Sequence, residues 1–493
     1  MSAAGLRRLR LAGWALAVAL GALQAWASRH DMNPDGVSYL DLGDAFVRGD
    51  LAQAVSAYWP PLYAVILGAA VGVLRPSPAW EFPLVHAVNF LLYHGALSSL
   101  EFLLANAAPR SPGWPAWAWR AWGSALFLVA ALHMVTLRLV TPDLLVLALF
   151  LLAAGWLGRW ADGRVGPREA VLFGAALGAG ALAKTVALPL AALGLGLALA
   201  AAPDRRRAAP RVLLALAAFV VVTGPWIGAV SARAGRLTLG ENSSLNYLWL
   251  VNREFQAPLV SFEVSRSAAW RLVHPPRHVF DAPDVWEFAR PVGGTLPLWF
   301  DPGYWHAGAA PRLSAADHAA ALRRSARAYG RLALRLLPLA VGLAVLGLVL
   351  GRARWTRRET ALTVFAVVPL GGYALIHVEP RYVVGAVVVL GLALLAAVRA
   401  AEPRALAAVT LTALPLAVLP VAIDVTYNAA HEARAALRGE ALPNQAWRTA
   451  GALRAAGVAA GDGVAVAGDP YQAGWARLAR VRIVAALSGR APR

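Results

Sequence analysis

Residues 336 to 350 read Leu-Leu-Pro-Leu-Ala-Val-Gly-Leu-Ala-Val-Leu-Gly-Leu-Val-Leu, a run without a single charged side chain. A second run, from Val383 to Val398, is equally apolar on every side. A helix at the surface of a soluble protein would instead alternate apolar residues at i, i+3 and i+4 with a charged face. Runs that are apolar all round therefore predict helices that lie in a membrane.

The composition of the whole chain agrees with a membrane protein. Of its 493 residues, 59% are hydrophobic and only 15% are charged, and the mean hydropathy is +0.56. This is more apolar surface than a soluble core could bury. The net charge of +19 comes almost entirely from arginines in short segments between apolar runs, a pattern that indicates topology and not nucleic-acid binding. Because the sequence contains no cysteine, disulfides, thiolate catalysis and cysteine-ligated metals are excluded.

About eleven apolar runs approach the roughly 20 residues that a helix needs to cross a bilayer. The first follows three arginines and resembles a signal peptide, and we expect it to be retained as a signal anchor. A shorter run, 62–74, is expected to be re-entrant or interfacial. The expected spans lie near 9–27, 81–105, 118–136, 144–161, 169–184, 186–202, 212–231, 332–351, 359–377, 382–400 and 405–424.

This count places every strongly basic segment on the cytoplasmic side, as the positive-inside rule requires. Counting 62–74 as a full span would invert one half of the molecule and leave a basic cluster outside. The basic segments are Arg7 to Arg10, Arg159 to Arg168, Arg205 to Arg211, Arg352 to Arg358 and Arg399 to Arg404.

The predicted fold is thus an all-α polytopic protein of the cell membrane, with a cytoplasmic N-terminus and an extracytoplasmic C-terminus. Residues 1–424 would form the transmembrane domain, with outer loops at 28–59 and 232–331. Residues 425–493 would form an extracytoplasmic α/β tail, in which Asn444 to Leu487 read as helix, strand, helix, strand and so predict a small cap. No internal repeat is visible in the sequence, which weakens the case for an inverted-repeat transporter.

The first outer loop carries three carboxylates within eleven residues, Asp31, Asp35 and Asp41. One interpretation is a solvated turn in which Asp35 caps the following helix. The other is a general base at the membrane surface. Asp143, in the sequence Thr-Pro-Asp, is open to the same two interpretations: a group at a helix N-terminus, or a binding residue.

Two cations on the same expected face are candidates for an anion site. Lys184 is the only lysine in the chain and stands between two apolar runs; it either snorkels to the interface or binds a phosphate. Arg381 either pairs with Glu379 or clamps a phosphate through its guanidinium. The segment from Pro297 to Trp305 is rich in aromatic and acidic residues, which suits carbohydrate, although an interfacial aromatic belt would have the same composition.

Four motifs, in this order along the chain, resemble the GT-C membrane glycosyltransferases, the superfamily of the protein O-mannosyltransferases and the lipid A aminoarabinose transferase, similar to glycosyltransferase family 39. The motifs are Asp35 with Tyr39 followed by Pro-Pro-Leu-Tyr at 60–63, Thr-Pro-Asp-Leu-Leu at 141–145, Gly-Ala-Leu-Ala-Lys-Thr at 180–185, and Glu-Pro-Arg-Tyr at 379–382. The sequence departs from the family at Gly36, where many relatives carry a glutamate, so paired acids are not supported there.

The resemblance implies transfer of a sugar from a polyprenyl-phosphate carrier to a hydroxyl of a lipid, glycan or protein on the outer face of the membrane. In that reaction Asp35 would be the base, Lys184 and Arg381 would offset the phosphate, and Asp143 would bind acceptor or sugar, or orient a basic group. No dedicated metal site is expected, although the carboxylates of this chain could recruit a divalent cation, as the resemblance to some relatives implies. Further binding residues would be Glu379, Tyr39, Tyr63, Asp301, Tyr304 and Trp305.

The alternative function is a non-catalytic translocator or binder of lipid-linked sugars that uses the same two cations to hold a headgroup. A transporter should carry charged residues along a path between the two faces of the membrane. Here the polar residues are expected to collect at one end, which favours the enzyme.

Overall fold

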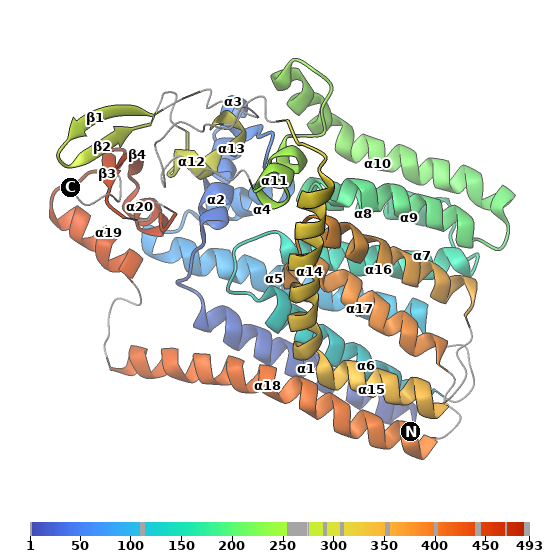
Figure 1. The fold of residues 1–493 in the computed structure, drawn as a ribbon. Helices are drawn as coiled ribbons and strands as arrows, with labels where there is room; N and C mark the ends of the chain where they lie inside the picture. Colours follow the sequence, from blue (N-terminus) through green and yellow to red (C-terminus); the bar gives the residue numbers. More distant parts are fainter. Residues whose placement is uncertain are drawn as a thin grey trace.

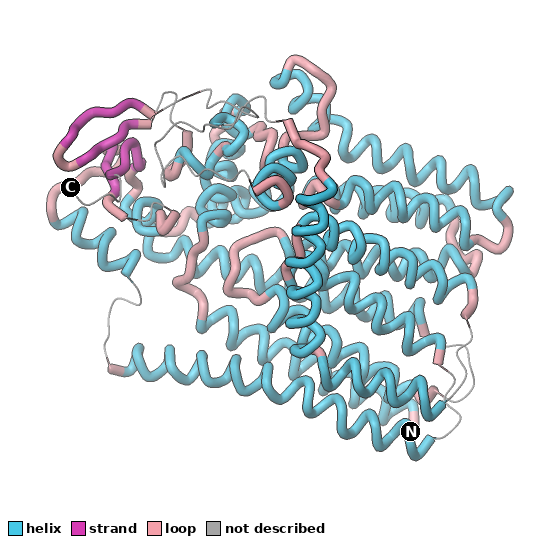
Figure 2. The backbone as a smooth tube through the Cα atoms, viewed as in Figure 1, coloured by secondary structure: helices cyan, strands magenta, loops and turns pink. Residues whose placement is uncertain are grey.

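The computed structural model describes residues 2–108, 114–253, 274, 276–288, 293–305, 310–350, 355–398, 403–438, 445–468 and 471–487. Most of this chain is helical, and one small group of strands lies at the same end of the molecule as the C-terminus (Figures 1 and 2). The N-terminus lies at the other end (Figure 1).

Eight helices in the described residues are long and apolar enough to cross a membrane, and a bent pair would make a ninth. The bent pair is α14 (Ala315–Arg335) and α15 (Leu337–Leu350), which meet at 80°. The eight are α1 (Ala3–Ala27), α5 (Pro78–Ala107), α6 (Ala116–Val129) with its π-helical extension η1 (Ala130–Val135), α7 (Asp143–Ala161), α10 (Arg205–Ala234), α16 (Arg357–Ile376), α17 (Pro380–Ala397) and α18 (Pro403–Leu437).

The number of spans is therefore smaller than the eleven predicted. The runs at 169–184 and 186–202 form α8 (Pro167–Ala183) and α9 (Ala187–Ala201), with 17 and 15 residues. At 1.5 Å per residue these helices are roughly 25 and 22 Å long, short of about 30 Å of hydrocarbon. The run at 62–74 forms α4 (Pro61–Leu74), which has 14 residues and is shorter still.

The basic segments collect at one end of the helix bundle. Arg357 donates a hydrogen bond to the carbonyl of Ala202, and Arg164 donates one to the side chain of Asn106. The polar regions predicted for the outer face gather at the other end, which we call the site end and define by Asp35, Asp143, Lys184 and Glu379. The separation of basic and polar regions follows the prediction, while the structure itself does not show which end faces the cytoplasm.

Short helices cover the site end. Among them, α2 and α4 cross at a point where no side chain fits, because a Cβ on Gly68 would lie 2.5 Å from the carbonyl oxygen of Gly43. This close approach fixes α2, the helix that begins at Pro34 and carries Asp35. The short helices are α2 (Pro34–Val47), α3 (Leu51–Ala54), α4, α11 (Asn242–Leu250), α12 (Pro297–Phe300) and α13 (Pro302–Trp305).

The strands form one mixed sheet in the order β1-β2-β4-β3. The hairpin of β1 (Arg277–Asp281) and β2 (Asp284–Glu287) comes from the long loop, and β2 pairs antiparallel with β4 (Arg482–Leu487). In the C-terminal tail, α19 (Gln445–Ala455), β3 (Gly463–Val466), α20 (Gly474–Ala479) and β4 follow the predicted helix, strand, helix, strand order. Half of the sheet thus comes from the long loop, which joins the tail to the site end.

Candidate active site

A cavity of about 750 Å³ opens at the site end. Its walls come from the start of α2, the turn before α7, the break between α8 and α9, helix α11, Trp299, and the junction of α16 and α17. Six of the predicted site residues line it, namely Asp35, Tyr39, Asp143, Lys184, Glu379 and Arg381. Segments separated by more than 300 residues therefore meet around one space.

Asp143 and Lys184 form a close ion pair on the wall of the cavity. The Lys184 ammonium lies 2.5 Å from one oxygen of Asp143 and 4.0 Å from the centre of the Tyr382 ring. The other Asp143 oxygen accepts a hydrogen bond of 2.8 Å from the Thr141 hydroxyl. The Asp143 side chain is only 1% exposed, so its charge depends on these partners. Asp143 stands in the first turn of α7, where its charge complements the helix dipole, and the same side chain holds the Lys184 ammonium.

Arg381 connects three carboxylates. Its guanidinium lies 2.7 Å from Glu379, 3.5 Å from Asp143 and 3.7 Å from Asp35. Glu379 also binds His377 at 3.3 Å. Burial opposes ionisation of Glu379, but the hydrogen bond from His377 and the charge of Arg381 outweigh it and lower the pKa of Glu379 to about 2. Glu379 is therefore ionised at neutral pH and holds Arg381 in place.

Asp35 occupies the first turn of α2 and has two partners. Trp299 donates its indole N–H to one oxygen at 2.8 Å, and Arg381 lies beside the other. Burial raises the pKa of Asp35, and Arg381 and the Trp299 hydrogen bond only partly offset it. A carboxylate with a raised pKa binds a proton more strongly than an ordinary aspartate, as a general base requires.

Asn33 anchors the start of α2 against the turn that leads to α7. Its side-chain oxygen accepts a hydrogen bond of 2.8 Å from the backbone N–H of Val140, and its amide nitrogen donates to the carbonyl of the same residue. At Gly36 a Cβ would lie 2.5 Å from the sulfur of Met32 and 2.7 Å from the Cβ of Val140. There is no room at this position for the glutamate of the resembling family, so Asp35 is the single acid of this turn that reaches the cavity.

Aromatic rings form the other wall. Trp59 packs edge-on against Tyr39 and Tyr58, and Trp249 stacks on Trp299 with ring centroids 5.9 Å apart. Helix α11 adds the amides of Asn242 and Asn246, one helical turn apart. Rings beside amides and carboxylates can hold the apolar faces and the hydroxyls of a sugar.

Several of these residues were not predicted as site residues. Trp299 stands in the segment from Pro297 to Trp305, where the predicted site residues are Asp301, Tyr304 and Trp305. Asn242 is the first residue of α11, and no residue of this helix is among the predicted site residues. Tyr58 directly precedes the Trp-Pro-Pro-Leu-Tyr sequence, and Trp249 follows the amides on the same helix. For Tyr58 and Trp249 the sequence offers one signal only, namely the concentration of aromatic residues in the outer loops 28–59 and 232–331.

Of the other four predicted site residues, two lie outside the cavity and two have side chains outside the described part of the structure. Tyr63 is fully buried behind the cavity, where its hydroxyl donates to Asn89 at 2.7 Å. Asp301 pairs with Arg233 at 3.2 Å and is not part of the cavity lining. Tyr304 and Trp305 belong to α13, but their side chains lie outside the described part of the structure.

A second cavity, of about 330 Å³, reaches the same carboxylates from another side. Asp35, Glu379 and Arg381 line both cavities, and Asn33, Met134 and Leu139 are among the residues that line the second one alone. These shared side chains form a thin wall between the two spaces, so Asp35 is accessible from both.

A divalent cation does not fit between the carboxylates of this site. Arg381 occupies the position between Asp35, Asp143 and Glu379 that a metal ion would need. In the described part of the chain, no three His, Asp or Glu side chains are placed to hold a metal ion. The arrangement instead provides a carboxylate base, two cations and an aromatic wall.

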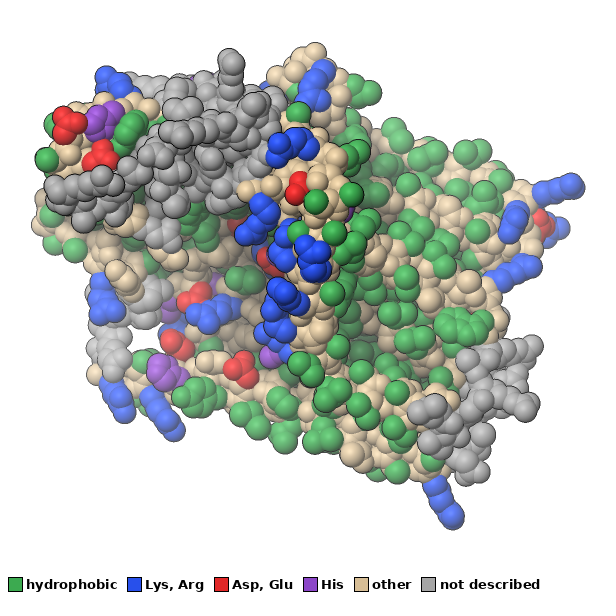
Figure 3. All heavy atoms as spheres, in the orientation of Figure 1, with side chains coloured by type: hydrophobic (Ala, Val, Ile, Leu, Met, Phe, Trp, Pro, Cys, Tyr) green, Lys and Arg blue, Asp and Glu red, His purple; other side chains and the backbone are tan. Residues whose placement is uncertain are grey.

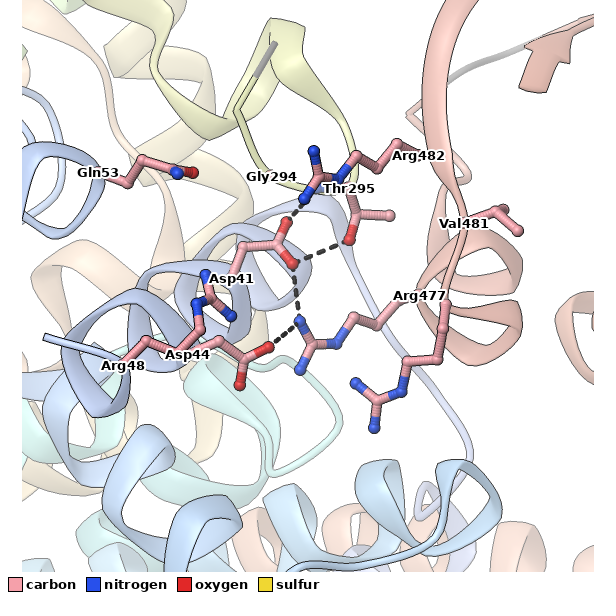
Figure 4. A pocket seen from close by; sticks show the side chains of 10 residues that line it. Asp41, Asp44, Arg48, Gln53, Gly294, Thr295, Arg477, Val481 and Arg482 are labelled. Carbon is pink, nitrogen blue, oxygen red and sulfur yellow. Dashed lines mark hydrogen bonds and ion pairs between the residues drawn. The ribbon is translucent and has the colours of Figure 1, made fainter. Parts of the chain in front are cut away.

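The opposite side of α2 is fastened by a buried arginine of the C-terminal tail. The Arg477 guanidinium lies 2.8 Å from Asp41 and 2.7 Å from Asp44, both on α2, and 2.6 Å from Glu81 on α5. Figure 4 shows Arg477 pointing between the two aspartates, in a polar pocket that Thr295 also lines. This network ties α2 to the tail and so holds the turn that carries Asp35.

Comparison with known proteins gives no match of the sequence to any protein-family model or to any curated protein. Among solved structures, the crystal structure of ArnT from Cupriavidus metallidurans bound to undecaprenyl phosphate aligns with a TM-score of 0.50 at 16% identity, over 97% of this chain and 77% of that one. The structure of the same protein in the apo state aligns with a TM-score of 0.43 at 17% identity, over 96% and 77% of the two chains. The chain therefore shares the fold of ArnT, which confirms at the level of the fold the GT-C resemblance that the sequence motifs predicted.

Proposed function

We propose that the chain is a glycosyltransferase that takes a sugar from a polyprenyl-phosphate carrier and transfers it to a hydroxyl on the outer face of the membrane. The observation that carries the proposal is one cavity in which a carboxylate with a raised pKa, two cations and a wall of aromatic rings come together. The fold adds support, because the ArnT structure with this fold holds undecaprenyl phosphate. Fold alone does not settle function, so the proposal depends on the site.

The donor would bind with its phosphate at Lys184 and Arg381. These cations lie on either side of Asp143 and border the aromatic wall. Val186, Pro189 and Ile376 line the same cavity and are apolar, which suits the first isoprene units of the lipid. The sugar would then lie against the rings of Tyr39, Tyr58 and Trp299, with its hydroxyls in reach of the α11 amides.

In the transfer step, the acceptor oxygen forms a bond to the anomeric carbon while the bond from that carbon to the phosphate oxygen breaks. The electron pair of the broken bond stays with the phosphate, and Lys184 and Arg381 stabilise the charge that develops there. Asp35 accepts the proton of the attacking hydroxyl, which makes this weak nucleophile reactive. The Trp299 indole holds Asp35 in position for this step.

The acceptor would approach Asp35 through the second cavity. This cavity shares Asp35 and Arg381 with the first, and Met134 and Leu139 give it an apolar side. An acceptor hydroxyl in this space could reach the base without displacing the donor. We assign no chemical class to the acceptor beyond the hydroxyl itself.

The translocator alternative is less favoured by the arrangement of charge. Lys184 and Arg381 are each paired with carboxylates at one end of the helices. A carrier would need such groups at successive depths between the two faces. A carrier also has no need for a carboxylate with a raised pKa beside the headgroup site.

The test is transfer of radiolabelled sugar in membranes loaded with a panel of polyprenyl-phosphate sugars. We expect the wild-type protein to transfer label and Asp35→Asn to do so at least 100-fold more slowly. A general base typically contributes a factor of about 10²–10⁴ to the rate. The matched control is Asp31→Asn, since Asp31 is an aspartate of the same loop that pairs with exposed Arg138. Equal transfer by wild type and Asp35→Asn would refute the assignment of the base, and no transfer from any donor would favour the translocator.

A further inference from the structure

Helix α14 carries a ladder of arginines that is separate from the cavity. Arg323, Arg327, Arg331 and Arg335 are spaced four residues apart, and all four are exposed. In the described part of the structure, none of the four makes an ion pair or hydrogen bond. At 100° per residue the four fall within about a third of the helix circumference. They form the arginine ladder, a surface of four uncompensated positive charges.

The other face of α14 packs on the protein. Ala321, Ser325 and Leu332 are buried on the side away from the ladder. On this face the Tyr329 hydroxyl donates to the carbonyl of Leu370 on α16 at 2.6 Å. Arg324, which at 100° per residue lies in the same sector as the ladder, donates to the carbonyl of Leu250 on α11 at 2.7 Å. The direction in which the ladder faces is therefore fixed by the packed face and by Arg324, and not by the four ladder arginines.

The position of α14 places the ladder at the edge of the apolar belt. Helix α14 runs across the bundle and meets α15 at an angle of 80° (Figure 1). Helix α15 in turn packs alongside α18. In Figure 3, basic side chains gather along α14, and on one side of this helix the surface is covered with hydrophobic side chains. Exposed Leu322 and Leu334 flank the ladder on the same helix. A basic amphipathic helix with this placement lies in the interface between lipid headgroups and acyl chains.

We propose that the arginine ladder of α14 binds the phosphate groups of anionic phospholipids in the adjoining leaflet. Among the described residues, the four guanidiniums have no hydrogen-bond or ion-pair partner in the protein. Phosphodiester headgroups offer the complementary charge and a geometry that suits arginine. Arg324 bonds the carbonyl of Leu250, a residue that lines the large cavity. The ladder thus begins beside the mouth of the cavity, and by binding lipid headgroups it would hold this mouth at the membrane surface. The proposal does not depend on the transferase reaction.

The test uses the full-length protein in detergent and measures by native mass spectrometry how tightly it retains phosphatidylglycerol and phosphatidylcholine with the same acyl chains. Near an anionic surface each arginine changes lipid affinity roughly fivefold. We expect R323Q/R327Q/R331Q/R335Q to weaken phosphatidylglycerol binding at least tenfold and to leave phosphatidylcholine unchanged. The matched control is R205Q/R206Q/R207Q/R211Q, which removes the same charge from the opposite end of the bundle and should change either lipid less than threefold.

Two further variants separate the effect of charge from the effect of misfolding. The fourfold Arg→Lys variant should keep most of the preference, because the charge remains. If the fourfold Gln variant fails to fold, judged by its melting temperature, R327Q/R331Q replaces it, with an expected loss of at least fivefold. Unchanged retention by the ladder variant, an equal loss in the control, or no preference in the wild type would each overturn the proposal. A loss confined to polyprenyl phosphate would also overturn it and would assign the ladder to the donor.

Discussion

Asp143→Asn tests whether Lys184 and Arg381 are phosphate ligands or only partners of a buried acid. The substitution keeps the shape of the side chain but removes the charge that lies 2.5 Å from Lys184 and 3.5 Å from Arg381. Hydrogen bonds to charged groups contribute about 1.5–3 kcal/mol, and the Lys184 side chain is 25% exposed, so water replaces part of the loss. We expect the empty protein to lose about 2 kcal/mol of stability, which lowers its melting temperature by a few degrees.

The same substitution should strengthen the binding of a lipid phosphate. A carboxylate about 6 Å from a bound phosphate repels it by about 3 kcal/mol at an effective dielectric constant near 20, and solvent in the open cavity reduces this figure. We therefore expect undecaprenyl phosphate to bind at least tenfold more tightly to Asp143→Asn than to the wild type, which corresponds to about 1.4 kcal/mol.

The assay is thermal unfolding of detergent-purified protein with and without undecaprenyl phosphate. The lipid should raise the melting temperature of Asp143→Asn more than that of the wild type, and Lys184→Met should show the smallest rise. Asp204→Asn, which removes an exposed acid at the opposite end of the bundle, is the control and should respond like the wild type. A loss of stability in Asp143→Asn that the lipid does not restore would refute the phosphate role, because the cations would then serve only to neutralise Asp143.

Four further predictions concern the turn, the tail, the base and the topology. Gly36→Ala should lower stability by about 1–3 kcal/mol through overpacking, whereas Gly228→Ala, where a Cβ meets no neighbouring atom within 4 Å, should not lower the melting temperature. Arg477→Met should cost about 3–5 kcal/mol, because buried Asp41 and Glu81 and half-buried Asp44 lose their shared partner, although Glu81 keeps Arg480. A melting temperature within a degree or two of the wild type would contradict this network. The transfer rate should rise with pH through the pKa of Asp35, since only the ionised carboxylate accepts a proton. Burial raises this pKa, so the midpoint of the rise should lie above the ordinary aspartate value of about 3.9. A midpoint at or below about 3.9 would argue against Asp35 as the base. Because the chain has no cysteine, a single introduced cysteine reports which side of the membrane it faces. Asp281→Cys in the β-hairpin should react with a membrane-impermeant maleimide added outside intact cells, and Arg206→Cys should react only after lysis. The reverse pattern would invert the predicted topology.

The charged part of the site could be predicted because its residues interrupt apolar runs. Asp143, Lys184 and Arg381 each stand where a hydrophobic segment begins or ends, and a charge at such a position needs a partner or a ligand. The motif order then places them at the same end of the bundle. Their mutual contacts, with Arg381 between three carboxylates, depend on how α7, α8 and α17 pack, and no local pattern specifies this.

The aromatic part could not be predicted residue by residue. Asp301 is the residue predicted in this segment, yet it is Trp299 that reaches Asp35, since Ser38 and Trp59 both bind the Trp299 carbonyl and fix the loop there. Tyr63 matches a family motif, but the helical phase of α4 turns it toward Asn89. The span count was too high for a different reason. Helices α8 and α9 form close to the predicted bounds, but with 17 and 15 residues they are shorter than a span of about 20 residues needs.

The resting network also explains why the site can hold two cations without a ligand. A lysine and an arginine beside an apolar, partly dehydrated cavity would be unstable alone, and Asp143 and Glu379 compensate them. Glu379, with its pKa near 2, stays bound to Arg381 at all physiological pH values, whereas Asp143 neutralises both cations from a position that water scarcely reaches. In the proposed reaction, a donor phosphate that approaches Lys184 would therefore compete with Asp143, so it would bind more weakly than two free cations would allow. The same competition would favour release of the polyprenyl phosphate after transfer, because Asp143 would recover its partner as the product leaves.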